Sequence, residues 1–134
     1  MLDHKHILVV HGLAGLDEFS LLGESRVAEV IDGKISEYSV TPEELGLKRC
    51  KIDDIAPGDP KYNAKTIREI FEGVERGPKR DVVVLNAAGA FVVGGKVQKL
   101  KEGAEYAQKV IDDGRALKKL NELVRVSQEM KKKD

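Results

Sequence analysis

Aromatic residues and cysteine are scarce in this sequence. Its 134 residues include no tryptophan, and aromatic side chains make up only 4% of the chain. Few side chains could therefore stack on unpaired bases, which argues against a nucleic-acid-binding protein. The single cysteine, Cys50, excludes an internal disulfide. We therefore expect a protein of the reducing cytoplasm.

The sequence also lacks a charge excess and a long apolar run. Its 23 basic residues balance its 23 acidic residues, so no net charge attracts nucleic acid or an anionic membrane. The apolar stretches Ile7–Val10 and Val82–Leu85 are far shorter than the roughly 20 residues that span a bilayer. A hydrophobic fraction of 41% beside a charged fraction of 34% is typical of a soluble globular domain. The composition thus predicts neither a nucleic-acid partner nor a membrane partner.

The first part of the chain predicts a strand, a loop and a β-hairpin. Ile7–Val10 is a β-branched apolar run, which we expect to be buried on both faces, as in a parallel sheet. The segment Gly12–Ser25 contains glycines and no periodicity, so it is predicted to be a loop leaving the end of that strand. Asp32-Gly33 separates two strand-like segments, 26–31 and 34–40, and predicts a type I′ turn between them.

The rest of the chain predicts helices. Thr41 as N-cap, Pro42 at the first helical position and Glu44 in a capping box predict a helix that Gly46 ends after about one turn. Further helices are expected after Asp59-Pro60, over 79–93 as one buried helix, over 102–113, and beyond Gly114. The apolar faces of the first and last of these are expected to comprise Ala64, Ile67, Ile70, Phe71 and Val74, and Leu117, Leu120, Leu123, Val124 and Met130.

So few strands for so many helices predict an incomplete domain. A self-contained α/β domain rarely has this balance, so the pattern indicates a partial α/β domain whose remaining strands lie on other sequence. Such a domain should expose apolar surface where its missing strands would pair, notably along Ile7–Val10. We therefore expect self-association, or edge pairing between copies.

Several separate motifs resemble one enzyme family. They are Val10-His11-Gly12, Gly15-Leu16-Asp17-Glu18-Phe19-Ser20, Thr41-Pro42-Glu43-Glu44-Leu45-Gly46-Leu47, Gly77-Pro78 with Leu85-Asn86-Ala87-Ala88, and Gly114-Arg115-Ala116. In this order and spacing they resemble the C-terminal part of anthranilate phosphoribosyltransferases, over nearly the whole chain. The resemblance implies that residues 1–134 are the C-terminal portion of a catalytic domain of the phosphoribosyltransferase and nucleoside phosphorylase type. The N-terminal helical region and the Gly-rich substrate loop of that family have no counterpart in this sequence.

The resemblance also implies an activity and a metal site. The family moves a phosphoribosyl group from phosphoribosyl pyrophosphate (PRPP) to anthranilate in tryptophan biosynthesis, and pyrophosphate departs with the help of Mg²⁺. By resemblance, Asp17 and Glu18 are the acids that hold this ion, and hard oxygen ligands suit it. PRPP and anthranilate would be substrates of the complete enzyme, and a complementary N-terminal chain is a candidate partner. Alone the chain should be inactive, because one wall of a cleft cannot position two substrates. No catalytic residue is assigned.

Other interpretations of the same residues stay open at this point. Adjacent acids are frequent here, and a solvated surface pair is the plainer interpretation of any one of them; the others are Glu43-Glu44, Asp53-Asp54 and Asp112-Asp113. His11 could face a ligand, but we interpret it as a structural histidine bonded to loop backbone. Gly94-Gly95-Lys96 suggests a phosphate loop, although the spacing and Val97 favour a helix C-cap. We interpret 86–88 as a small-residue segment that permits close helix packing.

Two alternative functions remain. The chain could be a non-catalytic interaction module that keeps the fold, or a fragment of a pyrimidine nucleoside phosphorylase, since those enzymes share the architecture. The uninterrupted residue matches around Asp17-Glu18 and over Leu85–Ala88 favour the anthranilate family.

Overall fold

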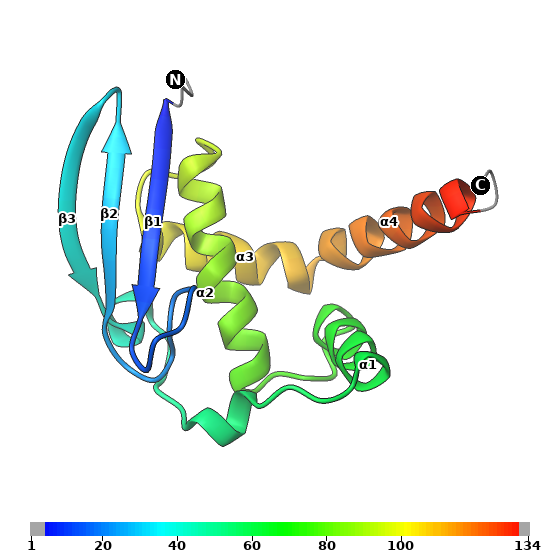
Figure 1. Ribbon diagram of the computed structural model, residues 1–134. Helices are drawn as coiled ribbons and strands as arrows, with labels where there is room; N and C mark the ends of the chain where they lie inside the picture. Colours follow the sequence, from blue (N-terminus) through cyan, green and yellow to red (C-terminus); the bar gives the residue numbers. More distant parts are fainter. Residues whose placement is uncertain (1–4, 132–134) are drawn as a thin grey trace.

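The computed structural model describes residues 5–131. It consists of a three-stranded antiparallel sheet with helices on one side of it (Figure 1). The strands, in the spatial order β1-β2-β3, are β1 His6–Gly12, β2 Ser25–Ile31 and β3 Lys34–Val40. Two short 3-10 helices follow, η1 Pro42–Leu45 and η2 Ile52–Ile55. The α-helices are α1 Pro60–Phe71, α2 Pro78–Val93, α3 Leu100–Asp112 and α4 Arg115–Lys131. None of the helices within residues 5–131 combines the length and apolar character needed to cross a bilayer.

The hairpin and the first short helix agree with the sequence prediction. Asp32 and Gly33 have φ values of 47° and 80°, the left-handed conformations that a type I′ turn requires at both central positions. The register pairs Val27 with Tyr38 across the hairpin. The η1 helix has the predicted capping box and ends at Gly46, whose φ is 79°. Local backbone chemistry is therefore sufficient to place these elements.

The first strand corrects the sequence interpretation. β1 pairs antiparallel with β2 and forms an edge of the sheet, and it is not buried on both faces. Its Leu8 and Val10 side chains pack against the core, whereas Val9 is 61% exposed. Alternate side chains of a strand point to opposite faces, and within residues 5–131 the helices cover only one of them (Figure 1). The exposed edge fits the expected incomplete domain, while self-association stays a prediction.

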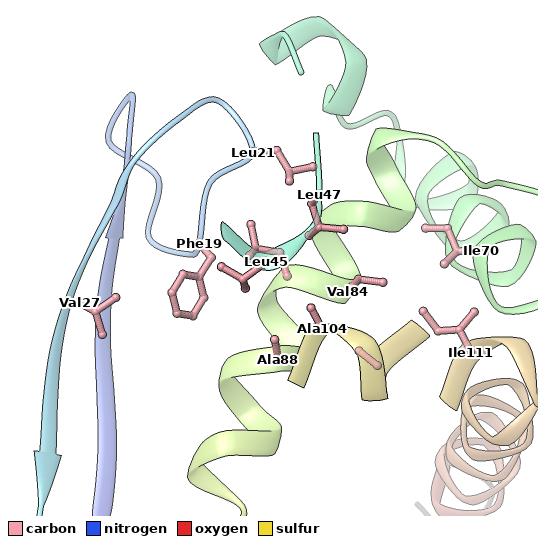
Figure 2. Close-up of a cluster of buried hydrophobic side chains, with 12 residues drawn as sticks. Phe19, Leu21, Val27, Leu45, Leu47, Ile70, Val84, Ala88, Ala104 and Ile111 are labelled. Carbon is pink, nitrogen blue, oxygen red and sulfur yellow. The ribbon is translucent and has the colours of Figure 1, made fainter. Parts of the chain in front are cut away.

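Helix α2 is the centre of the packing. It runs as one helix over the segment predicted to do so, and Val84, Leu85 and Ala88 are almost fully buried. It packs between the sheet and α3, with the core side chains shown in Figure 2 around it. A Cβ at Gly103 of α3 would lie 2.7 Å from the backbone O of Ala88. This contact confirms the close helix packing expected of residues 86–88.

The first and last α-helices bury less than their sequence patterns predicted. Helix α1 ends at Phe71, before Val74, which is 70% exposed, and Ile70 is its one fully buried side chain. Helix α4 has no buried residue, and it extends away from the sheet (Figure 1). Its Leu123 and Met130 are 64% and 65% exposed. The predicted inward orientation of these two residues is wrong, because no described element packs against that part of α4.

Candidate functional site

Asp17 and Glu18 lie on the connection between β1 and β2, residues 13–24, which we call the acid loop. It starts with a tight turn in which the Gly12 N–H donates to the backbone O of Leu16 over 2.9 Å. Ala14 and Gly15 at the tip have φ values of 67° and 77°. The turn reverses the chain directly after β1, so the two acids follow immediately at the C-terminal end of that strand.

The acid loop folds back so closely onto β1 that position 12 has no room for a side chain. A Cβ at Gly12 would lie 2.6 Å from the backbone O of Glu18 and 2.7 Å from Cβ of Ser20. Glycine is the one residue that allows backbone to approach this closely. Gly12 therefore fixes the distance between the end of β1 and the peptide of Glu18.

The second half of the acid loop belongs to the core. Phe19, Ser20 and Leu21 are 3%, 1% and 0% exposed. The Ser20 N–H donates to Ser25 Oγ over 2.9 Å, and the Cys50 N–H donates to the backbone O of Leu21 over 3.1 Å. The acids thus precede an anchored, buried segment, so their backbone is held although Asp17 itself is exposed and Glu18 half-buried.

Asn86, which the sequence analysis interpreted only as part of a close-packing segment, contacts this part of the acid loop. The carboxamide of Asn86, on α2, accepts a hydrogen bond from the Phe19 N–H over 2.9 Å. It also donates to the backbone O of Phe19 over 3.3 Å. The sequence held one signal for it: a single amide side chain interrupts a run of apolar and small residues, and buried polar groups normally have a partner.

Asp17 and Glu18 place two negative charges side by side. Burial raises the pKa of the Glu18 carboxyl above its usual value, and the nearby charge of Asp17 raises it further. The ion pairs found within residues 5–131 all join other side chains. A cation beside both carboxylates would offset the mutual repulsion and the burial of charge together, so the donor set fits a hard divalent ion.

The other adjacent acids are engaged elsewhere, which separates them from Asp17-Glu18. Each of the three other pairs contains carboxylates that cap a helix or form an ion pair. These contacts are Glu43 with Arg49 at 2.7 Å, Glu44 with the Thr41 N–H at 2.6 Å, Asp54 with the Lys51 N–H at 2.8 Å, Asp112 with Arg80 at 3.0 Å, and Asp113 with Arg115 at 2.8 Å. The other three acidic pairs therefore have structural roles in the fold. They give no reason to interpret Asp17-Glu18 as merely a solvated surface pair.

Glu18 borders a cavity of about 260 Å³ between η2, α1 and the start of α2. Its wall is mostly apolar, with Thr66 and Lys79 among the polar side chains. The Lys79 ammonium donates to the Tyr62 hydroxyl over 2.7 Å. Asp17 is not among the residues that line this cavity. A cation at Glu18 and an anionic group near Lys79 would complement the charges at its rim.

The described residues offer a small donor set. Within residues 5–131 no group of three or more His, Cys, Asp or Glu side chains is placed to hold a metal ion. Asp17 and Glu18 could supply two carboxylates at most. Mg²⁺ is commonly bound in this way, by one or two carboxylates with waters and substrate phosphates as the other ligands.

The pKa shift of Glu18 predicts that replacing this acid stabilises the metal-free fold. Its folded-state pKa lies above the unfolded one, so ionisation costs the folded state more, and stability falls as the pH rises through that interval. Glu18→Gln removes this cost, and because water screens the partly exposed carboxyl we expect only a small gain, up to about 0.5 kcal/mol at pH 7, that vanishes at pH 3. Urea unfolding at both pH values measures it. The exposed Glu105→Gln on α3 is the control, and a destabilised Glu18→Gln at pH 7 would contradict the prediction.

Two further sequence interpretations can be compared with the structure. His11 is exposed on the uncovered face of the sheet, where it lines a shallow groove with Arg26 and Glu37. It forms no hydrogen bond to the acid loop among the described residues, so its interpretation as a loop-bonded structural histidine is wrong. Gly94 is the C-cap of α2, and the Lys96 N–H donates to the backbone O of Phe91 over 2.9 Å. The C-cap interpretation is confirmed there.

Comparison with known proteins agrees with this architecture. An anthranilate phosphoribosyltransferase from Petrotoga mobilis is 49% identical over 120 residues, which are 90% of this chain and 35% of that protein. Its counterpart from Phenylobacterium zucineum is 47% identical over 127 residues, which are 95% of this chain and 37% of that protein. The resemblance stated for the sequence is thereby confirmed. The chain spans little more than a third of the length of these relatives.

Solved structures give the same result. The crystal structure of anthranilate phosphoribosyltransferase from Thermus thermophilus matches with a TM-score of 0.80 and 42% identity, over 90% of this chain and 35% of that one. The Saccharomyces cerevisiae enzyme in complex with PRPP and Mg matches with a TM-score of 0.77 and 28% identity, over 85% of this chain and 33% of that one. The fold is thus a partial α/β domain, as the sequence predicted.

Residues 1–117 match the family described as "Glycosyl transferase family, a/b domain". This range contains the whole sheet, the acid loop and the α2–α3 pair. The chain therefore belongs to this glycosyl transferase family.

Proposed function

We propose that residues 1–134 are the C-terminal portion of the catalytic domain of an anthranilate phosphoribosyltransferase, in which Asp17 and Glu18 hold Mg²⁺ beside the pyrophosphate of PRPP. The observation that carries the proposal is the acid loop. It presents two adjacent carboxylates at the end of β1 that join none of the ion pairs found among residues 5–131, and its following residues are buried in the core. The relatives' names and the yeast complex with PRPP and Mg support the choice of substrate and ion.

The role of the chain in such a reaction is to hold two carboxylates in place. When bound, Mg²⁺ neutralises charge that gathers on a departing pyrophosphate. The Gly12 contact on one side and the buried Phe19 on the other keep the Glu18 peptide in position, so little reorganisation is needed when the ion binds. Groups that bind the ribose and anthranilate would come from the two-thirds of the relatives that this chain does not match.

The remaining part of the enzyme also explains the exposed side of the sheet. Val9 on the edge strand and Ile35 on β3 are 61% and 72% exposed, on the face that no described element covers. We propose that the rest of the complete domain packs there, supplied by a complementary N-terminal segment. Without it, copies of the chain would associate through this apolar face or pair along the edge that β1 forms.

A chimera tests the proposed activity. This chain would replace the matching third of the Petrotoga mobilis relative, with which it shares 49% identity. We expect turnover of PRPP and anthranilate by the chimera and none by the 134-residue chain alone, because the chain provides one wall of the cleft. The unmodified relative is the positive control. A folded chimera without activity would contradict the enzymatic proposal and favour a non-catalytic module, and turnover by the lone chain would contradict the incomplete-cleft argument.

A further inference from the structure

We propose that Asn86 is a positioning residue for the metal-binding acids. Its carboxamide pairs with the backbone of Phe19 and thereby sets the position of the adjacent Glu18. The inference rests on the proposed function of the acid loop and extends that site to a residue of α2, 67 positions from Phe19 in the chain.

The pairing of Asn86 with Phe19 has the form of a strand contact. Asn86 Oδ1 accepts from the Phe19 N–H over 2.9 Å, and Asn86 Nδ2 donates to the Phe19 O over 3.3 Å. One carboxamide thus satisfies both backbone polar groups of a buried residue, as a neighbouring strand would. Since an N–H can only donate, the contact also fixes which carboxamide atom is the oxygen.

A third hydrogen bond ties the same carboxamide to its own helix. Asn86 Nδ2 also donates to the backbone O of Val82, one turn earlier in α2, over 3.1 Å. The orientation of the side chain is therefore set by α2, which is the most buried helix of the described chain. The acid loop takes its position from a rigid element.

The ring of Phe19 provides a second, independent contact with α2. Phe19 is 3% exposed and lies between the sheet and α2 (Figure 2). A Cβ at Gly89 would lie 2.8 Å from its Cε2 atom. Gly89 follows Asn86 by three positions, so the two residues share one face of the helix. Together they hold the backbone and the ring of Phe19.

Glu18 is consequently restrained from both sides. Its own carbonyl lies against Gly12, where a Cβ would come within 2.6 Å. The next residue, Phe19, is fixed by Asn86 and Gly89. Outer residues that orient metal ligands commonly change metal affinity by about 10- to 100-fold when they are replaced. Asn86 has the geometry for such a role, although it touches neither the ion nor the substrate.

Asn86→Leu removes all three hydrogen bonds at similar volume. We expect the protection of the Phe19 amide against hydrogen exchange to fall about tenfold, as the loss of one hydrogen bond implies, while the α2 amides of Val84 and Ala88 keep theirs. Affinity for Mn²⁺ with inorganic pyrophosphate, followed by EPR on the 134-residue chain, should fall at least about tenfold. Asn121→Leu, the same change on α4, is the control and should alter neither quantity.

Asn86→Asp adds a readout that a merely structural role would not change. Both forms of the carboxyl can accept from the Phe19 N–H, but the oxygen that replaces Nδ2 faces the carbonyl oxygens of Phe19 and Val82. When ionised it repels both carbonyls and pushes the Phe19 backbone away, whereas the protonated carboxyl can donate to one of them. Protection of the Phe19 amide, corrected for intrinsic exchange, should therefore recover as the pH is lowered in this variant and stay level in the wild type. The variant also remains informative if Asn86→Leu does not fold.

Three outcomes of the exchange experiments would overturn the inference: an unchanged Phe19 amide in Asn86→Leu, loss of protection spread equally over Val84 and Ala88, or no pH recovery in Asn86→Asp. An unchanged Mn²⁺ affinity in a folded variant with a loosened Phe19 would equally overturn it. Absence of Mn²⁺ binding by the wild-type chain would instead refute the metal role of Asp17 and Glu18. The exchange data would then still decide whether Asn86 fixes the acid loop.

Discussion

Asp17→Asn and Glu18→Gln are each expected to lower kcat/KM of the chimeric enzyme by about 100-fold or more. Charge stabilisation by a metal ion contributes several kcal/mol to a transition state, and each 1.36 kcal/mol is about a factor of ten in rate. An amide is a neutral and weaker ligand than a carboxylate for a hard cation. The rate of anthranilate-dependent PRPP consumption, measured over a range of Mg²⁺ concentrations, gives both the loss and any shift in metal requirement.

The chain contains a suitable control for these two variants. Asp53, in the Asp53-Asp54 pair on η2, is an exposed acid, and Asp53→Asn should leave kcat/KM within about twofold because surface changes are usually small. Equal losses in Asp53→Asn and Asp17→Asn would show that the effect is a general charge effect. Full activity of both acid-loop variants at low Mg²⁺ would remove the basis of the proposed metal site.

Gly103→Ala is expected to lower the free energy of unfolding by about 3 kcal/mol, as severe overpacking in a core does. The added Cβ would lie 2.7 Å from O, 2.9 Å from Cα and 3.1 Å from C of Ala88. These are all backbone atoms, so no side chain can rotate away, and α2 and α3 would have to separate along their shared interface. This loss of stability exceeds the gain of about 1 kcal/mol that the higher helix propensity of alanine brings over glycine.

Urea unfolding, followed by circular dichroism, measures this change. Glu105→Ala, on the exposed side of the same helix, should stay within about 0.5 kcal/mol of the wild type. A loss below about 0.5 kcal/mol for Gly103→Ala would contradict the close helix contact. The double variant Gly103→Ala with Ala88→Gly should give little rescue, because the atoms in conflict belong to the backbone of position 88.

Part of the candidate site was accessible from the sequence and part was not. Asp17 and Glu18 could be found because their motif is contiguous and resembles a known family. Asn86 was interpreted from the sequence as part of a packing segment. Its contact lies 67 positions away, and a lone amide among apolar residues does not indicate which distant segment it pairs with. The exposure of His11 was missed for a similar reason. A strand's sequence does not tell which of its faces will be covered by another layer.

The sequence by itself determined the elements whose geometry depends on neighbouring residues. Asp32-Gly33 set the hairpin, Thr41, Pro42 and Gly46 bounded the first short helix, and the glycines flanking 78–93 bounded α2. Turn and cap preferences act over a few residues, so they can be read directly from the chain.

Only the tertiary structure decided which surfaces became core and which acids remained available. Val9 lies in a continuous apolar run and Leu123 in a helical apolar repeat, yet both are exposed. Three acidic pairs became caps or ion pairs, while Asp17-Glu18, on a loop held by α2, joins no ion pair in the part of the chain that the structure describes. Burial and charge pairing depend on contacts between distant segments, and those distances exist only after the sheet, α2 and α3 have packed together.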